Sequence, residues 1–231
     1  LARLTGGDGL VQIGSDAVRG TALWNDAPDG LVMACGWVVD YKGVVPDELV
    51  FPVDVRGIAD SVFGGISNLK TVTYLGDPAD VIVGRGAFYE TPYEATAYPF
   101  LGSPTDANAQ ALATGKLLFV LSGADWCPWT TIVKKYLRWL GDDFFSRFVV
   151  YYCNVDTDTH GMAWGVPSYG VFDPAKFSVN WYDGCLASNS GGVEERVQKV
   201  IDDGLAAYGQ GMAELLTWYT TKAEAFAAAK A

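Results

Sequence analysis

Residues 122–130, SGADWCPWT, carry the clearest indication of the fold of this chain. An apolar run, LLFVL at 117–121, precedes the stretch, and apolar residues with helical spacing follow it. This order predicts a buried strand, a short turn and a helix that begins next to Cys127. Unsatisfied backbone N–H groups and the helix dipole favour a thiolate at such a position, so Cys127 is a candidate nucleophile.

The flanking sequence predicts the rest of a mixed sheet. Five segments show the patterns of regular elements. They are a helix in PTDANAQALATG (104–115) with an Asp or Thr start and a Gly stop, a strand in FVVYYCNVD (148–156), a pair of strands in VPSYGVFD (166–173) and FSVNWYDG (177–184), and a helix with apolar residues at 193, 197, 200, 201 and 205. The order β-α-β followed by β-β-α predicts an α/β domain with parallel and antiparallel strands in one sheet.

Three motifs in this order resemble the thioredoxin fold over residues 100–208. They are DWCPWT (125–130), VPS (166–168) and the glycine turn YDG (182–184) followed by Cys185. The resemblance implies a cis Val166–Pro167 bond that faces Cys127. It also implies that Trp126, Trp129, Thr130, Val166 and Pro167 form the substrate groove, with Cys185 at its rim.

Two departures from the thioredoxin pattern bear on chemistry. Thr130 stands where the family has its resolving cysteine, so exchange within a CxxC pair is impossible. Leu121 stands where the family has a buried acid, and a leucine cannot move protons. The retained Cys127 leaves thiol–disulfide exchange through one thiol as an alternative function.

The four cysteines allow three complete pairings, and the sequence alone does not choose among them or exclude four free thiols. If Cys127 has a partner, we expect it to be Cys185, the position that the resemblance brings to the rim of the site. Cys153 is expected to point into the core, because Val149, Tyr151 and Cys153 alternate on one strand face.

The first half of the chain is repetitive. IGSDAV (13–18), IADSVF (58–63) and VGRGAF (83–88) share one pattern, and the second and third copies are 25 residues apart. The longer first interval holds LVMACGWVVDYKG (31–43), which predicts an inserted β-hairpin.

Residues 1–95 resemble the BspA-type leucine-rich repeats of bacterial surface and secreted proteins. LVFPVDVRGIADSVFGGISNLKTV (49–72) follows that repeat almost position by position, although the Asn/Cys ladder of the family is missing. The resemblance implies a secreted or cell-surface location and a protein- or glycan-binding surface. A spacer or a cap for the next domain is the alternative. The start at Leu1 suggests that further repeats precede the segment.

Composition sets the remaining limits on domains. Residues 89–105 are rich in Pro, Thr and Gly and predict a domain boundary between about 92 and 104. Residues 209–231 have an apolar face at helical spacing and predict a C-terminal helix that packs across the domains, or less simply docks a partner.

Composition also limits the partners. The net charge of −11 disfavours nucleic acid and anionic membranes, and no apolar run is long enough to span a bilayer. His160 is the one histidine, so we expect neither a metal site nor a cofactor. The sequence therefore predicts a repeat-type module joined to a degenerate thioredoxin-like domain, with protein or peptide binding as its main function.

Overall fold

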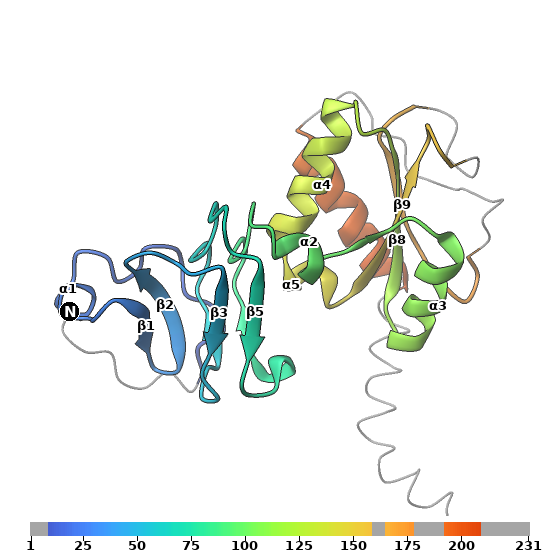
Figure 1. Ribbon diagram of the computed structural model, residues 1–231. Coiled ribbons are helices and arrows are strands. Elements are labelled where there is room, and N and C mark those ends of the chain that lie inside the picture. The colour runs from blue at the N-terminus through green and yellow to red at the C-terminus, as the bar shows by residue number, and fades with distance from the viewer. Residues whose placement is uncertain (1–8, 159–164, 178–191, 209–231) are drawn as a thin grey trace, which may run out of the picture. The chain divides into compact units, whose positions relative to one another are not determined.

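The computed structural model describes residues 9–158, 165–177 and 192–208, which form a mixed α/β structure (Figure 1). Two compact units divide the chain: residues 1–99 together with 135–146, and residues 100–134 together with 147–231. The sequence indicates a division near residue 99 but not the assignment of 135–146 to the first unit. The expected C-terminal helix, 209–231, lies outside the described residues.

The first unit is built on two small sheets. Strands β1 (Gly30–Ala34) and β2 (Trp37–Lys42) form an antiparallel hairpin, and the short strands β4 (Gly57–Ile58) and β6 (Ile82–Val83) continue it in parallel. β3 (Glu48–Phe51) pairs in parallel with β5 (Thr71–Tyr74). Parallel neighbours joined by loops rather than long helices mean that the chain advances by stacked coils.

Two positions recur with a left-handed backbone conformation, one inside each of the three sequence copies and one two residues after the end of each copy. The first is Asp16, Ser61 and Gly86, with φ of 56°, 58° and 63°, and the second, four residues later, is Gly20, Gly65 and Glu90, with φ of 74°, 78° and 56°. Because L-residues with a side chain rarely adopt this conformation, its recurrence at equivalent positions shows that the three copies turn in the same way.

Backbone hydrogen bonds and stacked rings join the second copy to the third. The amide of Ser61 donates to Arg85 O at 3.0 Å, and the amide of Phe63 donates to Ala87 O at 2.9 Å. The Phe63 and Phe88 rings stack with centroids 5.7 Å apart and planes only 7° from parallel. Both rings are buried in the core of this unit, so the repeat places an aromatic residue on the inside of each of these coils.

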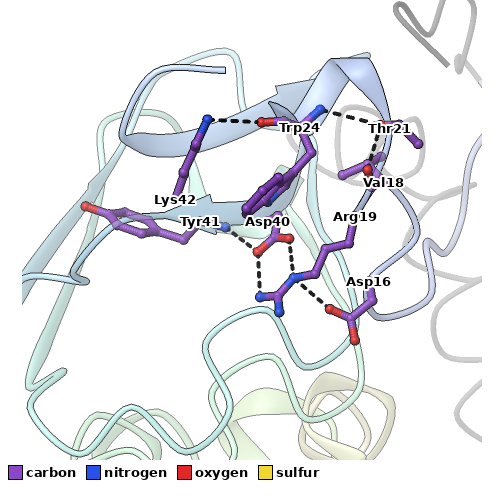
Figure 2. A network of polar contacts seen from close by, with 8 residues as sticks. All are labelled: Asp16, Val18, Arg19, Thr21, Trp24, Asp40, Tyr41 and Lys42. Carbon is purple, nitrogen blue, oxygen red and sulfur yellow. Dashed lines mark hydrogen bonds and ion pairs between the residues drawn. The ribbon is translucent and has the colours of Figure 1, made fainter. Parts of the chain in front are cut away.

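A polar network holds residues 16–27 against β2, as Figure 2 shows. The Arg19 guanidinium pairs with the buried Asp40 carboxylate through bonds of 2.8 and 3.3 Å, and Asp16 joins Arg19 at 2.9 Å. The Lys42 ammonium donates to three carbonyls at the end of helix α1 (Ala22–Asn25), those of Trp24, Asn25 and Ala27. These polar contacts fix residues 16–27 together with an apolar cluster, in which Val18, Leu23 and Trp24 pack with Trp37 of β2.

Short helices and the segment 135–146 complete the first unit beside the third copy. The unit also contains the 3-10 helix η1 (Pro78–Asp80), α2 (Glu94–Ala97) and α5 (Asp142–Phe145). The amide of Gly86 donates to Trp139 O at 2.8 Å, and the Tyr98 and Phe145 rings stack at 4.8 Å. These contacts cover the end of the coil stack with apolar and aromatic surface.

The described residues of the second unit form a four-stranded sheet in the order β10-β8-β9-β7. The strands are β7 (Phe100–Leu101), β8 (Leu117–Gly123), β9 (Phe148–Asn154) and β10 (Ser168–Phe172), and only β10 runs antiparallel. Helix α3 (Pro104–Thr114) begins at Ser103, whose hydroxyl accepts from the Asp106 amide, and ends at Gly115 with φ of 65°. The predicted end of this helix at Gly115 is correct, whereas Ser103 caps its start in place of the predicted Asp or Thr.

Helices lie on both faces of this sheet. Figure 1 shows α3 on one side of β8 and β9 and the helix of residues 193–208 on the other. Ala107 and Ala111 of α3 pack in one cluster with Val149, Tyr151 and Cys153, so the expectation that Cys153 points into the core is confirmed. The second strand of the expected pair, 177–184, falls almost wholly outside the described residues.

Candidate functional site

Cys127 lies between β8 and helix α4 (Pro128–Leu140), at the carboxyl end of a central strand. Its amide donates to Ala124 O at 3.0 Å, and its carbonyl accepts from the Thr131 amide at 3.2 Å. These two bonds form a tight turn and begin the helix. Apolar residues at helical spacing, including Val133 and Leu137, bury the inner face of α4 and hold this turn in place.

The thiol of Cys127 is turned inward. Only 3% of the residue is exposed, and its Sγ donates to Val166 O at 3.6 Å. The Val166–Pro167 peptide bond is cis, as the resemblance implies. The structure thus brings Cys127, Val166 and Pro167 together, and Val166 and Pro167 are half-buried.

Thr130 lies beneath this turn rather than on the surface. Its side chain is buried, and its hydroxyl accepts from the Ala124 amide at 3.4 Å. A Cβ on Gly123 would come within 2.4 Å of the Thr130 methyl group, so the glycine is needed for this close approach. Thr130 therefore fixes the junction of strand and helix and offers little surface to a bound molecule.

Trp126 and Trp129 lie just before and just after Cys127 in the chain, and both are exposed to solvent. Trp126 is 70% exposed and Trp129 is 54% exposed. Indole side chains are highly buried on average in folded proteins, and contiguous exposed apolar patches mark contact surfaces. These two side chains are the apolar surface that the site presents.

An acidic residue that the sequence did not single out fixes the loop. The Asp125 carboxylate accepts from Lys134 Nζ at 2.8 Å, from the Tyr152 hydroxyl at 2.8 Å and from Asn154 Nδ2 at 3.0 Å. The Lys134 ion pair lowers the pKa of Asp125, and the Tyr152 hydrogen bond adds to this effect. Burial raises the pKa of Tyr152, and the charges of Asp125 and Asp156 add to the rise.

Sequence spacing carried no signal for this network. Lys134 follows Asp125 by nine residues, whereas Tyr152 and Asn154 come from β9. The parallel register that pairs Gly123 with Asn154 brings them together. The same register places Leu121 opposite Tyr152. Leu121, which stands where the thioredoxin pattern has a buried acid, is fully buried.

The other cysteines do not complete a redox pair among the described residues. Cys35, Cys127 and Cys153 are free thiols. Burial raises the pKa of Cys153, which is fully enclosed in the core. Cys185 and His160 lie outside the described residues.

No protein-family model matches the chain, and neither a curated protein nor a solved structure is significantly similar to it. A search of the described residues finds no helix with the length and apolar character to cross a bilayer. Within the same residues, no three His, Cys, Asp or Glu side chains gather as metal ligands do.

Proposed function

We propose that this protein binds a protein or peptide segment at the surface formed by Trp126, Trp129 and the Val166–Pro167 turn. The observation that carries the proposal is the exposure of two indoles on a fixed turn. A rigid aromatic surface binds with a small loss of conformational entropy. Under this proposal the second unit is a thioredoxin-like domain that keeps the groove of that fold and lacks its resolving thiol.

Thiol–disulfide exchange through Cys127 is the second candidate function. The position of Cys127 before α4 and beside the cis-proline turn favours it. The burial of Cys127 weighs against it, because only 3% of the residue is exposed and its Sγ has little access to a substrate disulfide. Thr130 and Leu121 remove the resolving thiol and the proton carrier, so we place binding ahead of exchange.

We also propose, on the resemblance of residues 1–95, that the first unit is a short array of BspA-type repeats in a secreted or cell-surface bacterial protein. The parallel pairing of residues 25 apart, Gly57 with Ile82, supports this proposal. The array then serves as a second binding surface or as a spacer.

Panning of random twelve-residue peptides displayed on phage against the immobilised full chain tests the binding proposal. Selected peptides should lose most of their affinity for the Trp126→Ala/Trp129→Ala variant. They should keep it for Leu112→Ala, which removes an exposed apolar side chain from α3 in the same unit. Peptides that bind both variants equally well would show that the indoles are not the site.

Alkylation of the native chain by iodoacetamide tests the second candidate. If Cys127 has no role in thiol exchange, the half-buried Cys35 should react faster than the buried Cys127. The two alkylation rates should become similar in denaturant. Mass spectrometry of tryptic peptides follows both sites in one sample. Faster native reaction at Cys127 than at Cys35 would favour thiol exchange.

A further inference from the structure

We propose that the segment bound over Trp126 and Trp129 is basic, with an arginine or lysine side chain that stacks on an indole face. This inference rests on the proposed binding function and specifies its ligand class. It follows from the chemistry of the exposed surface and from the charges fixed beside it.

Indole faces are the strongest cation–π acceptors among protein side chains. Trp126 and Trp129 are exposed at 70% and 54%, so their faces are open to a bound cation as well as to apolar groups. Their positions at i and i+3, one before α4 and one in its first turn, allow one extended segment to touch both.

The basic side chain that holds this loop, that of Lys134, already binds other groups of the protein. The Lys134 ammonium pairs with Asp125 at 2.8 Å and lies 3.4 Å from the centre of the Tyr152 ring. It is also only 24% exposed, so it offers little to an anionic ligand. Cation–π binding on an aromatic ring already occurs here inside the protein.

The carboxylates outnumber this ammonium. Asp125 is 68% exposed although it accepts three hydrogen bonds, and Asp156 contributes a second negative charge near Tyr152. The whole chain carries a net charge of −11. Charge complementarity therefore favours a cationic segment over an acidic one, and it disfavours a second copy of this chain.

The loop is rigid enough to discriminate. Asp125 is held by donors from α4 and β9, and the Ala124 amide is held by Thr130. The backbone that carries the two indoles is therefore held in place before a ligand binds, which reduces the ordering that binding must supply.

Fluorescence anisotropy with three matched pools of fluorescein-labelled ten-residue peptides tests the inference on the full chain. Each pool has the same randomised apolar and polar positions and two fixed positions that carry arginine, citrulline or glutamate. Citrulline keeps the size and planarity of arginine without its charge. The arginine pool should bind about 2- to 30-fold more tightly than the citrulline pool, the range expected for a cation–π contact.

Variants of the loop locate the effect. Trp126→Ala and Trp129→Ala should reduce or remove the preference for arginine, and Asp125→Asn should weaken it while circular dichroism shows an unchanged fold. Leu112→Ala is the matched control and should leave it unchanged. Added salt should reduce binding of the arginine pool more than binding of the citrulline pool.

The outcomes separate this inference from the proposed function. Equal affinity for arginine and citrulline peptides, or preference for glutamate, with binding that still depends on the indoles would overturn the inference and keep the binding site. Binding of all three pools that is unaffected by Trp126→Ala and Trp129→Ala, or no binding at all, would overturn both.

Discussion

Single residues with a left-handed backbone define the turns of the first unit. Ser61 and Glu90 carry side chains at positions where the equivalent residues, Gly86 and Gly65, are glycines. A left-handed conformation costs an ordinary residue about 1–2 kcal/mol, whereas glycine adopts it without that penalty. The sequence does not show this equivalence, because Ser or Glu stands in some copies at a turn position that favours glycine.

Ser61→Gly is therefore expected to stabilise the protein. The gain in the free energy of unfolding should be about 0.5–1 kcal/mol, since the relief of strain is partly offset by the greater freedom of glycine in the unfolded chain. Urea denaturation followed by circular dichroism measures it. Gly65→Ala, at φ of 78° with open space around its Cα, is the control and should destabilise by about 1 kcal/mol. A loss of stability in Ser61→Gly would contradict the argument.

At the scale of elements, the junction of β8 and α4 depends on a close approach. The Thr130 side chain packs against Gly123 and holds the Ala124 amide, so the strand ends and the helix begins within a few residues. The sequence predicts both elements and the turn between them. It does not reveal that Thr130 faces inward, because that depends on how the helix packs against the strand.

Gly123→Ala should destabilise this junction by about 1–3 kcal/mol, because its Cβ would overlap the Thr130 methyl group. The double variant Gly123→Ala/Thr130→Ser removes that methyl group and keeps the hydroxyl, so it should recover part of the loss. Thermal unfolding of the two variants and of Thr130→Ser alone gives the coupling between the sites. Strictly additive effects would show that the predicted overlap is relieved elsewhere.

Two glutamates, one in helix α2 and one just before it, lie near basic residues in the C-terminal part of α4. The pKa values of these two glutamates are shifted in opposite directions. Glu94 is buried, its Oε1 has no hydrogen-bond partner among the described residues, and Arg138 Nη1 is 4.0 Å from Oε2. Burial raises the pKa of Glu94. The Lys135 ion pair lowers the pKa of the exposed Glu90.

The two glutamates should therefore affect stability with opposite signs. For Glu94, whose folded pKa is raised, stability is retained below the unfolded pKa of about 4.3 and lost as the pH rises through the folded value. Glu94→Gln should thus gain stability relative to wild type between pH 4 and pH 7. For Glu90, stability is present above about 4.3 and lost as the pH falls, so Glu90→Gln should lose relative stability over the same rise.

Urea denaturation of wild type and both variants at pH 4, 5.5 and 7 measures this difference. Glu90→Gln serves as the control for the loss of one negative charge. The same pH trend in both variants would mean that net charge, rather than the burial of Glu94, decides the effect.

At the scale of the whole molecule, the two compact units are not two continuous pieces of sequence. Residues 135–146 belong with residues 1–99, so α4 contributes its first residues to one unit and its last residues to the other. Within the first unit, Trp139 O accepts from the Gly86 amide, and Phe145 stacks on Tyr98. A cut near residue 99 therefore does not yield a complete first unit.

Residues 1–99 produced alone should be markedly less stable than the same residues in the full chain. The fragment loses the backbone and aromatic contacts of 135–146 and exposes apolar surface around the third copy. Hydrogen exchange of the Phe63 and Gly65 amides, which pair with Ala87 and Tyr89, measures the stability of the coil stack in both molecules. Equal protection in fragment and full chain would show that the coil stack is independent of 135–146.

Local pattern in the sequence determined much of this protein. Apolar periodicity predicts β8, β9 and α4, and the 25-residue spacing matches the parallel pairing of β4 with β6. The VPS motif marks the cis bond at Pro167. These features depend on residues close together in the chain or on a repeated unit, so their signals survive in a linear sequence.

Tertiary structure alone decided what surrounds the thiol and where the first unit ends. The Asp125 network joins a loop, a helix and a neighbouring strand, and the assignment of 135–146 depends on contacts with residues about fifty positions earlier. Such contacts depend on strand register and helix packing, which a linear pattern does not encode. The same packing buries Cys127 and leaves Trp126 and Trp129 exposed, and our proposal of binding ahead of exchange rests on this difference.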